Sequence, residues 1–462
     1  MRDAVIVDAV RTPVGKAQSP GSSKPGGQHA GTHPVELLAG TLTALAERTG
    51  IDPAGLDDVI GGCVDQVGEQ AMNTTRWAVL AAGFPESVPA TTVDRQCGSS
   101  QQAIHFAAQG VLSGAYDMVI ACGVESMSRV PMWSNVPPGA DPFGPSVARR
   151  YADGLIPQGV SAELIAAKWG LSRTELDEFA AESHRRAAAA DFTAELTAPG
   201  RDECIRPGTT AEILAGLRPS FYDEAMARRF PQIGWHITAG NSSPLNDGAS
   251  AVLIMSSEKA AALKLRPKAR LHGFAVAADD PVMMLTAIIP ATEKVLGKVG
   301  MSITDIDLFE VNEAFASVVL AWQRETGADP ATINVNGGAI AIGHPLGASG
   351  ARLMTTLVHA LEARGGRWGL QTMCEAAAWP TRRSSNASER TNQWRQLLAP
   401  AKHSRVVADC IAAGHLTRSA RQQRVRIGTS IGPPPGNIRS SSARTRPRSA
   451  ARSWSVAVMS TL

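Results

Sequence analysis

Up to about residue 375 the chain alternates short apolar, β-branched runs with longer segments of helical periodicity. Residues 34–48 show the helical pattern, because Val35, Leu38, Leu42 and Leu45 recur every three or four positions and form one apolar stripe. The short runs predict strands at residues 5–9, 59–61, 118–122, 251–255, 308–311 and 368–373. Strands that alternate with helices are typical of layered proteins with buried sheets, so we predict an α/β fold.

The pattern repeats within the chain at an offset of 252 residues, which superposes Gly98 on Gly350 and Cys122 on Cys374. Both copies contain a small-residue loop, a helix, a glycine and a strand that ends in cysteine. We therefore predict two similar α/β halves, with an active site where they meet.

Residues 125–236 differ in composition from the two repeats: a Pro/Gly-rich stretch is followed by two predicted Ala-rich helices at 162–169 and 175–190. This insertion fits either a lid or a plain helical subdomain, and the sequence does not separate the two.

Composition and charge distinguish the end of the chain from its body. The 462 residues are 44% hydrophobic and 19% charged, which excludes a fibrous repeat, a disulfide mini-protein and a wholly disordered protein. From Ala376 onward the chain has 14 Arg and 1 Lys but only two acidic residues, Glu389 and Asp409. The formal net charge is therefore +13 for this tail and −10 for the rest of the chain. No apolar run reaches the roughly 18 residues of a membrane helix, and no secretory signal is present. We expect a cytoplasmic protein that does not bind membranes.

Cys97 is a candidate nucleophile. The six cysteines form no C-x-x-C pair and no zinc-like spacing with histidine, so we expect no metal site. Cys97 lies among small residues directly before an amphipathic helix, and the N–H groups and dipole of a helix N-terminus stabilise a thiolate. A buried cap cysteine is the alternative, and this context alone does not decide between them.

His344 is a candidate base, because it is the titratable group of a glycine-rich loop, residues 337–350, that again leads into a helix. Glycines let a backbone approach a ligand closely, and a histidine held there can take the proton of a thiol. A dinucleotide loop is the alternative, but the glycines do not follow G-x-G-x-x-G. Asn312 and Cys374 follow predicted strands, where α/β enzymes commonly place function.

Six ordered motifs resemble those of thiolases over roughly residues 1–375. They are Arg-Thr-Pro-Val-Gly-Lys at 11–16, the Cys97 loop at 94–101, His-Ile-Thr-Ala-Gly-Asn-Ser-Ser at 236–243, Asn-Glu-Ala-Phe at 312–315, the Gly-His-Pro loop and Met-Cys at 373–374. The resemblance implies a five-layered α-β-α-β-α core of two similar halves with a loop domain. It also implies a homodimer or homotetramer that acts on coenzyme A thioesters without a bound cofactor.

The resemblance further implies a role for each matched residue. Cys97 would attack the ketone of a 3-ketoacyl-CoA and become acylated, after His344 removes the thiol proton. Cys374 would protonate the departing acetyl-CoA carbanion, or generate it in the reverse direction. Asn312 would hold a water that, with His344, binds the enolate oxygen.

Substrate-binding positions are implied in the same way. Ser243 would line the coenzyme A path, Gly343 would contact the substrate, and the N–H of residue 376 would form a second oxyanion hole with that of Cys97. Thiolases carry glycine where this chain has Ala376, so a backbone that requires positive φ would be strained there. Gln158, where many relatives have methionine, leaves acyl-chain selectivity open.

The resemblance stops after Glu375, where the sequence becomes Arg/Ser-rich and loses periodicity. One codon choice for residues 375–389, with one G restored after the first codon, reads Glu-Gly-Gly-Gly-Met-Ala-Asn-Ala-Thr-Ile-Ile-Glu-Arg-Leu and then stops. That segment would supply the glycine run and last strand of a thiolase. We hypothesise a single-base deletion that leaves residues 376–462 out of frame and disordered and the second half without its last strand. Nucleic-acid binding by this basic tail is the alternative, which its dispersed arginines and few aromatics do not favour.

The predicted domains are an N-terminal half at residues 1–258, with the loop domain inserted at about 125–236, a C-terminal half at 264–375 and the tail. The predicted function is a thiolase-type acyltransferase that cleaves 3-ketoacyl-CoA, or condenses two acetyl-CoA, through an acyl-cysteine. The pair of Cys97 and Cys374 favours this over a Cys-His-His ketosynthase. A catalytically impaired homologue that only binds or scaffolds is the alternative from another class.

Overall fold

The computed structural model describes residues 2–18, 25–375 and 455–461, the last segment for its backbone only. Its strands are β1 (Ala4–Arg11), β2 (Gly15–Lys16), β3 (Asp58–Gly62), β4 (Ala90–Val93), β5 (Met118–Ser126), β6 (Asn246–Ser256), β7 (Ala269–Ala277), β8 (Leu308–Val311), β9 (Trp368–Thr372) and β10 (Ser455–Thr461). Its helices are α1 (Pro34–Thr49), α2 (Thr74–Ala81), α3 (Ser99–Ser113), α4 (Gly144–Arg150), α5 (Gln158–Lys168), α6 (Arg173–Ala189), α7 (Ala211–Ala215), α8 (Glu224–Arg229), α9 (Ser257–Ala262), α10 (Ile288–Val299), α11 (Ala316–Thr326) and α12 (Ser349–Arg364).

The strands form a continuous sheet in the order β4-β3-β5-β6-β1-β7-β10-β9-β8, with β2 paired to β6. Its two halves join where β1 and β7 pair antiparallel over three residues. In the first half β4, β3 and β5 are parallel, and β6 runs antiparallel to both β5 and β1. The succession β3, α3, β5 recurs as β8, α12, β9, at the spacing that the sequence repeat predicts to within two residues.

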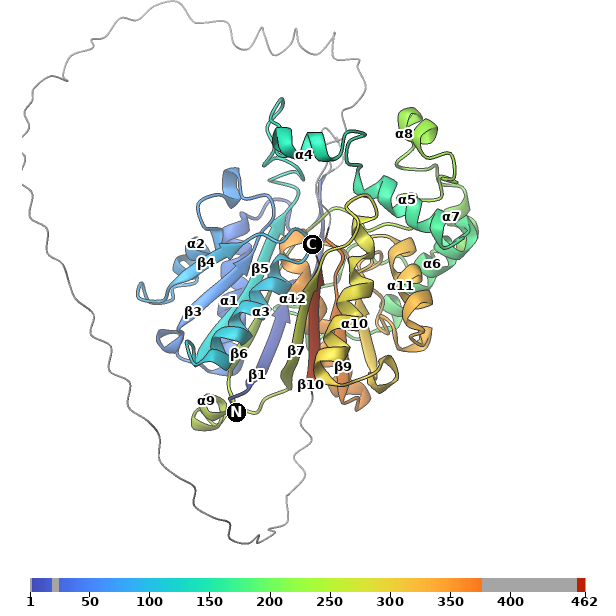
Figure 1. The fold of residues 1–462 in the computed structure, drawn as a ribbon. Coiled ribbons are helices and arrows are strands. Elements are labelled where there is room, and N and C mark those ends of the chain that lie inside the picture. The colour runs from blue at the N-terminus through green and yellow to red at the C-terminus, as the bar shows by residue number, and fades with distance from the viewer. Residues whose placement is uncertain (1, 19–24, 376–454, 462) are drawn as a thin grey trace, which may run out of the picture. The chain divides into compact units, whose positions relative to one another are not determined.

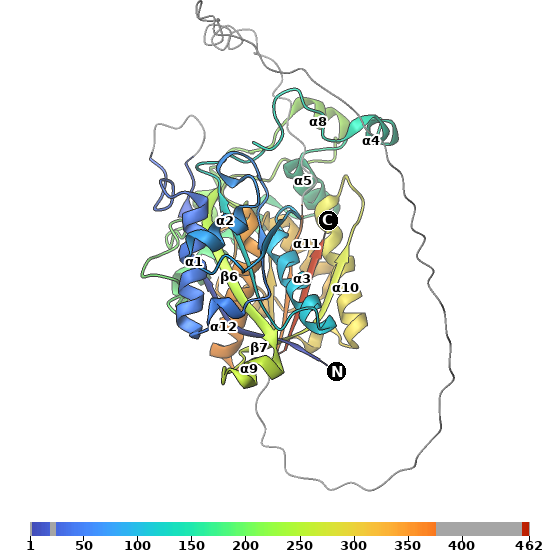
Figure 2. The same cartoon turned by 90° about the vertical axis from the view of Figure 1, so that its left-hand side faces the viewer.

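Helices and sheet halves stack in five layers (Figure 1). α1 and α2 cover the outer face of the first half, where Leu38 and Val79 share an apolar cluster with Ile120. α3 and α12 lie between the halves, and their residues Ile104 and Leu357 form a second cluster. α10 and α11 cover the outer face of the second half (Figure 2). The predicted α-β-α-β-α fold is confirmed.

Elements predicted from buried apolar runs are present. The six predicted strands coincide with β1, β3, β5, β6, β8 and β9, and the predicted helix at 34–48 is α1. The prediction omitted β4, which is short and partly exposed, and β7, in which buried and exposed positions are mixed. Both strands lack the continuous apolar run of a strand covered on both faces.

The insertion between β5 and β6 holds α4 to α8, and the two predicted Ala-rich helices are α5 and α6. These helices pack against α11, since Ile165 and Leu176 share an apolar cluster with Val318 and Trp322. The insertion is therefore packed onto the second half of the molecule.

The end of the chain differs from the sequence prediction. Residues 455–461 form β10, which occupies the position between β7 and β9 that was expected to be empty. The predicted disorder and frame change of residues 376–454 lie outside the described residues. The proposed domain limits at 258, 264 and 375 stay predictions. Within the described part of the chain no helix is long and apolar enough to cross a bilayer.

Gly123→Ala should lower the free energy of unfolding by about 1–3 kcal/mol. Gly123 lies in β5, and a Cβ atom there would overlap the carbonyl oxygen of Gly347, a backbone atom that cannot move aside like a side chain. Gly40→Ala is the matched control, because Gly40 is exposed in α1 with nothing within 4 Å of its Cβ position. That control should stabilise the protein by about 0.5–1 kcal/mol. Urea unfolding measures the stability of both variants. A Gly123→Ala variant as stable as the original protein would contradict the close approach of the backbones.

Candidate active site

Cys97 lies in a tight turn between β4 and α3. The Asp94 carboxylate accepts the N–H of Gln96 (2.7 Å), and the Ser99 hydroxyl donates to the Gln96 carbonyl (2.6 Å). Ser99 Oγ also accepts the N–H of Arg95 (2.9 Å), and Gln96 has a left-handed φ of 49°. These bonds hold Cys97, which is 7% exposed, two residues before the start of α3. The thiol therefore lies near the partial positive charge of a helix N-terminus, as the sequence predicts.

The backbone before His344 requires glycine. Gly343 has φ 120°, and a Cβ atom there would lie 2.6 Å from Val14 Cγ1 and 2.9 Å from the Asn246 side chain. The His344 N–H donates to Asn246 Oδ1 (2.8 Å), so the loop is fastened to the first residue of β6. His344 is thereby fixed between the two halves of the sheet.

Ser349 orients the imidazole of His344. The Ser349 hydroxyl donates its proton to the Pro345 carbonyl (2.7 Å), so its oxygen is left to accept from His344 Nδ1 (2.6 Å). The proton of a neutral His344 therefore sits on Nδ1, and Nε2 is left as an acceptor. Asn312 Nδ2 lies 3.5 Å from this Nε2.

Burial keeps His344 uncharged. The side chain is 3% exposed, and burial, with a smaller contribution from the charge of Arg352, lowers the pKa of His344 to about 3. At neutral pH the residue is therefore an uncharged imidazole whose Nε2 lone pair faces Asn312 Nδ2.

Asn312 and Cys374 follow the parallel strands β8 and β9. The Asn312 N–H donates to the Thr372 carbonyl (3.0 Å), which extends the pairing of these strands by one residue. Asn312 Oδ1 is buried and has no hydrogen-bond partner within the described residues. It is therefore a spare acceptor directly beside His344.

Cys374 is buried, with 1% of its surface exposed. Burial first, and then the charge of Glu375, raise the pKa of the Cys374 thiol to about 12, although a hydrogen bond with the Asn312 side chain opposes the shift. At neutral pH Cys374 holds its proton and is a potential proton donor.

The structure brings these residues together where the N-termini of α3 and α12 face each other. The Ala351 N–H donates to Ser100 Oγ (2.9 Å), which links the first turns of the two helices. Cys97 shares one apolar cluster with Leu346 and Met373, which flank His344 and Cys374 in the sequence. The Cys97 thiol, a neutral imidazole and a second, protonated thiol thus reach the same region from both repeats.

The remaining predicted residues lie around this centre. Ser243 is half-buried, and its N–H donates to the carbonyl of Ala314, two residues after Asn312. Gly343 precedes His344 in the loop described above. Ala376 lies outside the described residues, so the second oxyanion hole stays a prediction.

Sequence reasoning missed Asn246, Ser349 and Glu375. The first two orient the His344 loop, Ser349 through local bonds and Asn246 through a bond across 98 positions of the sequence, for which spacing alone gives no signal. Ser349 could have been found, since it opens the helix five residues after His344. Glu375 packs against Gly98, where a Cβ atom would overlap its carboxylate.

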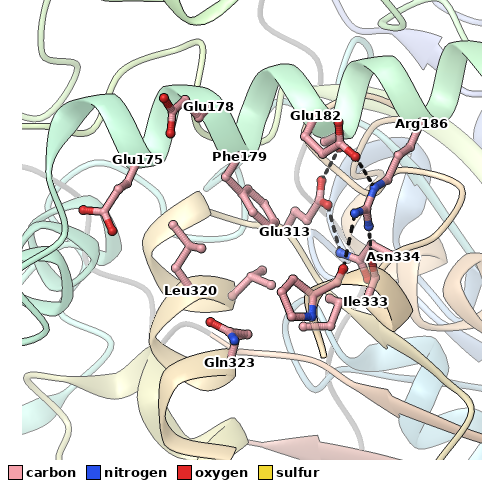
Figure 3. A pocket seen from close by; sticks show the side chains of 13 residues that line it. Glu175, Glu178, Phe179, Glu182, Arg186, Glu313, Leu320, Gln323, Ile333 and Asn334 are labelled. Carbon is pink, nitrogen blue, oxygen red and sulfur yellow. Dashed lines mark hydrogen bonds and ion pairs between the residues drawn. The ribbon is translucent and has the colours of Figure 1, made fainter. Parts of the chain in front are cut away.

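A separate pocket lies between α6 and α11 (Figure 3) and has a volume of about 300 Å³. Glu313, next to Asn312 in the sequence, points into it and accepts from Ser183 Oγ (2.7 Å), Asn334 Nδ2 (2.8 Å) and the Ile340 N–H (3.1 Å). Cys97, His344 and Cys374 do not line this pocket. Adjacent residues of one motif thus serve the candidate site and the packing of α6.

Within the described residues we find no group of three or more His, Cys, Asp or Glu side chains that could hold a metal ion. The site is built from thiols, imidazole, amide and backbone groups.

Comparisons with known proteins match most of the chain. Two family models, "Thiolase, N-terminal domain" and "Thiolase, C-terminal domain", match residues 4–258 and 265–381. The steroid 3-ketoacyl-CoA thiolase FadA6 of Mycobacterium tuberculosis is 48% identical over 394 residues, which cover 81% of this chain and 92% of that protein. A 3-ketoacyl-CoA thiolase of Aeromonas salmonicida is 42% identical, over 81% and 96% of the two chains. The crystal structure of the Bacillus anthracis acetyl-CoA acetyltransferase matches with TM-score 0.71 and 35% identity, over 82% of this chain and 97% of that chain.

Between pH 7.5 and 5 the protein should lose about 2 kcal/mol more of its free energy of unfolding than the His344→Asn variant. The folded state holds the pKa of His344 near 3, whereas the unfolded imidazole binds a proton near pH 6.5. Below pH 6.5 the unfolded state therefore binds more protons, so this stability is present above pH 6.5 and is lost as the pH falls toward 3. Urea unfolding at both pH values measures the difference, and a difference independent of pH would contradict a buried neutral His344.

Proposed function

The chain belongs to the thiolase family, and from that premise we propose that it cleaves 3-ketoacyl-CoA with coenzyme A to acetyl-CoA and a shortened acyl-CoA. The reverse reaction is the condensation of two acetyl-CoA. The observation that carries the proposal is the pair of cysteines, one from each repeat, in the same region of the fold as a neutral histidine. A Cys-His-His condensing site would lack the second thiol.

The first step is nucleophilic attack by Cys97. His344 Nε2 takes the thiol proton, and the thiolate adds to the 3-keto carbon of the substrate. The bond between the α- and β-carbons then breaks and leaves its electron pair on the α-carbon of acetyl-CoA. The products of this step are an acyl-Cys97 and the enolate of acetyl-CoA.

The second thiol completes the step. Cys374 gives its proton to the α-carbon, and acetyl-CoA leaves. Coenzyme A then enters, loses its thiol proton to the Cys374 thiolate and attacks acyl-Cys97. The shortened acyl-CoA is released, and Cys97 recovers the proton held by His344. Atoms and charge balance over the cycle, which needs coenzyme A as a substrate and no resident cofactor.

Asn312 stabilises the enolate through a water molecule. Its unpaired Oδ1 can accept one hydrogen of a water that donates the other to the enolate oxygen. His344, protonated on Nε2 after the first step, donates to the same oxygen. Ser243, Gly343 and the N–H of Ala376 are proposed to contact the coenzyme A thioester, with Ala376 in the second oxyanion hole.

We place the dimer interface at the free edge of β4. Within the described residues β4 pairs only with β3, so one edge of the sheet offers unpaired backbone groups. Met72 in the turn before α2, Trp77 on α2 and Phe106 on α3 are exposed apolar side chains, and both helices contact β4. A second copy would cover both the edge and these side chains, and two dimers could form a tetramer. The cytoplasmic location stays a prediction from the sequence.

The purified chain should cleave acetoacetyl-CoA in the presence of coenzyme A, and Cys97→Ser should lower kcat/KM by roughly 10³-fold or more. The loss is expected because serine at this position has no base strong enough to ionise it. Cys122→Ala is the control, since Cys122 is a buried thiol in β5 outside the site. Mass spectrometry after mixing with acetyl-CoA should find an acetyl group on Cys97.

The same assay separates the two functional readings. A folded chain that neither cleaves the substrate nor acylates Cys97 would favour the scaffold reading. A version with the restored reading frame shows whether such silence comes from the altered end of the chain. Longer 3-ketoacyl-CoA substrates measure the acyl preference that the sequence leaves open.

Trp77→Glu should convert a dimer into a monomer, because a charge would be buried in the proposed interface. Light scattering measures the mass of both proteins. Ile213→Glu is the matched control, since Ile213 on α7 is also exposed but lies away from β4 in the fold. A wild-type chain that is monomeric at micromolar concentration would contradict the proposal.

A further inference from the structure

Strands β7 and β9 lie one strand apart and face each other across the position of β10. Among the described strands other than β10, β7 pairs only with β1, over the three residues Ala269 to Leu271. In the same set of strands β9 pairs only with β8. Each of the two strands would therefore present a row of unpaired N–H and C=O groups to the other without an occupant between them.

Helices close this position on both faces. α10 contacts β7, β9 and β10 from the outer layer, and α3 contacts β10 from the middle layer. An occupant is thus a central strand shielded from solvent, and backbone groups left unpaired there would cost free energy. A segment suits this position when its backbone can pair with both β7 and β9 and when it carries no charged side chain.

The internal repeat indicates which strand belongs in this position. β1, β6 and β5 of the first half correspond in place to β7, the β10 position and β9. β6 runs antiparallel to both of its neighbours. β10 instead runs parallel to both β7 and β9. β10 therefore has the opposite direction to the strand that the repeat calls for, and it reaches the site from the far end of the chain.

The sequence of β10 suits a buried central strand. Ser-Val-Ala-Val-Met-Ser-Thr has no charged residue, whereas the preceding tail holds 14 arginines. A parallel strand covered on both faces typically has such a continuous run of small and apolar residues. A parallel connection needs about a dozen residues or more, and residues 376–454 supply far more than that.

We propose that the space between β7 and β9 is a strand-acceptor site and that residues 455–461 of the same chain fill it as a replacement strand. The segment pairs with residues 270–277 of β7 and with residues 368–371 of β9. Only its backbone pairing and uncharged sequence are required, so the long connection is a tether.

Occupation of this site supports the candidate active site. Val458 is paired with Gln371, and Thr372, which follows, accepts the N–H of Asn312. Cys374 comes two residues after β9. The strand that carries Cys374 and receives Asn312 is therefore held on one side by β8 and on the other by β10.

Hydrogen exchange of the full chain, read by mass spectrometry, tests the proposal. The amides of residues 455–461 should exchange at least ~100-fold more slowly than those of a synthetic peptide of the same sequence. The protection should not change when the protein is diluted, because the strand comes from its own chain. Exchange as fast as in the free peptide would overturn the proposal, and protection that falls on dilution would assign the strand to a second copy instead.

Val458→Pro tests the pairing directly. Val458 is paired with both Phe274 and Gln371, and proline removes the N–H that one of the two edges needs. The exchange of residues 270–277 and 368–372 should accelerate at least ~10-fold in this variant. Ala450→Pro, upstream of β10 in the same tail, is the matched control and should leave both segments unchanged. Unchanged protection of β7 and β9 in Val458→Pro would overturn the replacement-strand assignment, and this readout does not depend on enzymatic activity.

Discussion

The close approach of two backbones in the middle of the molecule sets the geometry on which the site depends. Gly62, the last residue of β3, and Gly123, within β5, leave room for the backbone of Gly347. A Cβ atom at Gly347 would in turn lie 2.6 Å from the Val124 carbonyl oxygen. The buried Glu125 carboxylate fastens this contact, since it accepts the N–H of Gly347 (2.8 Å) from one repeat and of Val64 (3.0 Å) from the other. The first turn of α12, and with it the His344 loop, can therefore lie against the half that carries Cys97.

Burial gives the acid and the base of this site their states by one and the same effect. Removal from water disfavours any charged form, so it lowers the pKa of His344 and raises that of Cys374. Each group is then neutral near pH 7, the imidazole with a lone pair on Nε2 and the thiol with its proton still bound. Arg352 and Glu375 act in the same directions as burial and widen the separation of the two pKa values. A proton-transfer pair thus follows from packing, without an ion pair between the two groups.

The sequence predicts those features that periodicity and local motifs encode. Buried strands such as β5 and helices such as α1 repeat one pattern over their length, and Cys97 and His344 stand next to glycines and helix starts. Asn246 and β7 are beyond such patterns for different reasons, whereas the place of Ser349 at the start of the helix after His344 can be read from the sequence. Asn246 acts through a fold contact with a residue almost a hundred positions away, and β7 mixes buried and exposed positions. The predicted loss of the last strand rests on residues 376–389 alone. It does not take into account that residues 455–461, much later in the chain, pair with the edges of β7 and β9.

The strand position also explains how the architecture before residue 376 could be kept whatever sequence follows it. The two repeats are joined through the β1–β7 pair, through the facing helices α3 and α12 and through Glu125, all of which lie before residue 376. What the end of the chain must supply is one set of backbone hydrogen bonds between β7 and β9, and such bonds are made by any uncharged extended segment regardless of its side-chain order. The proposed second oxyanion hole demands more than this, since it would need a specific backbone conformation at residue 376. A replacement strand therefore restores the sheet more readily than it restores the chemistry, so stability and turnover of this chain are separate properties that need not vary together.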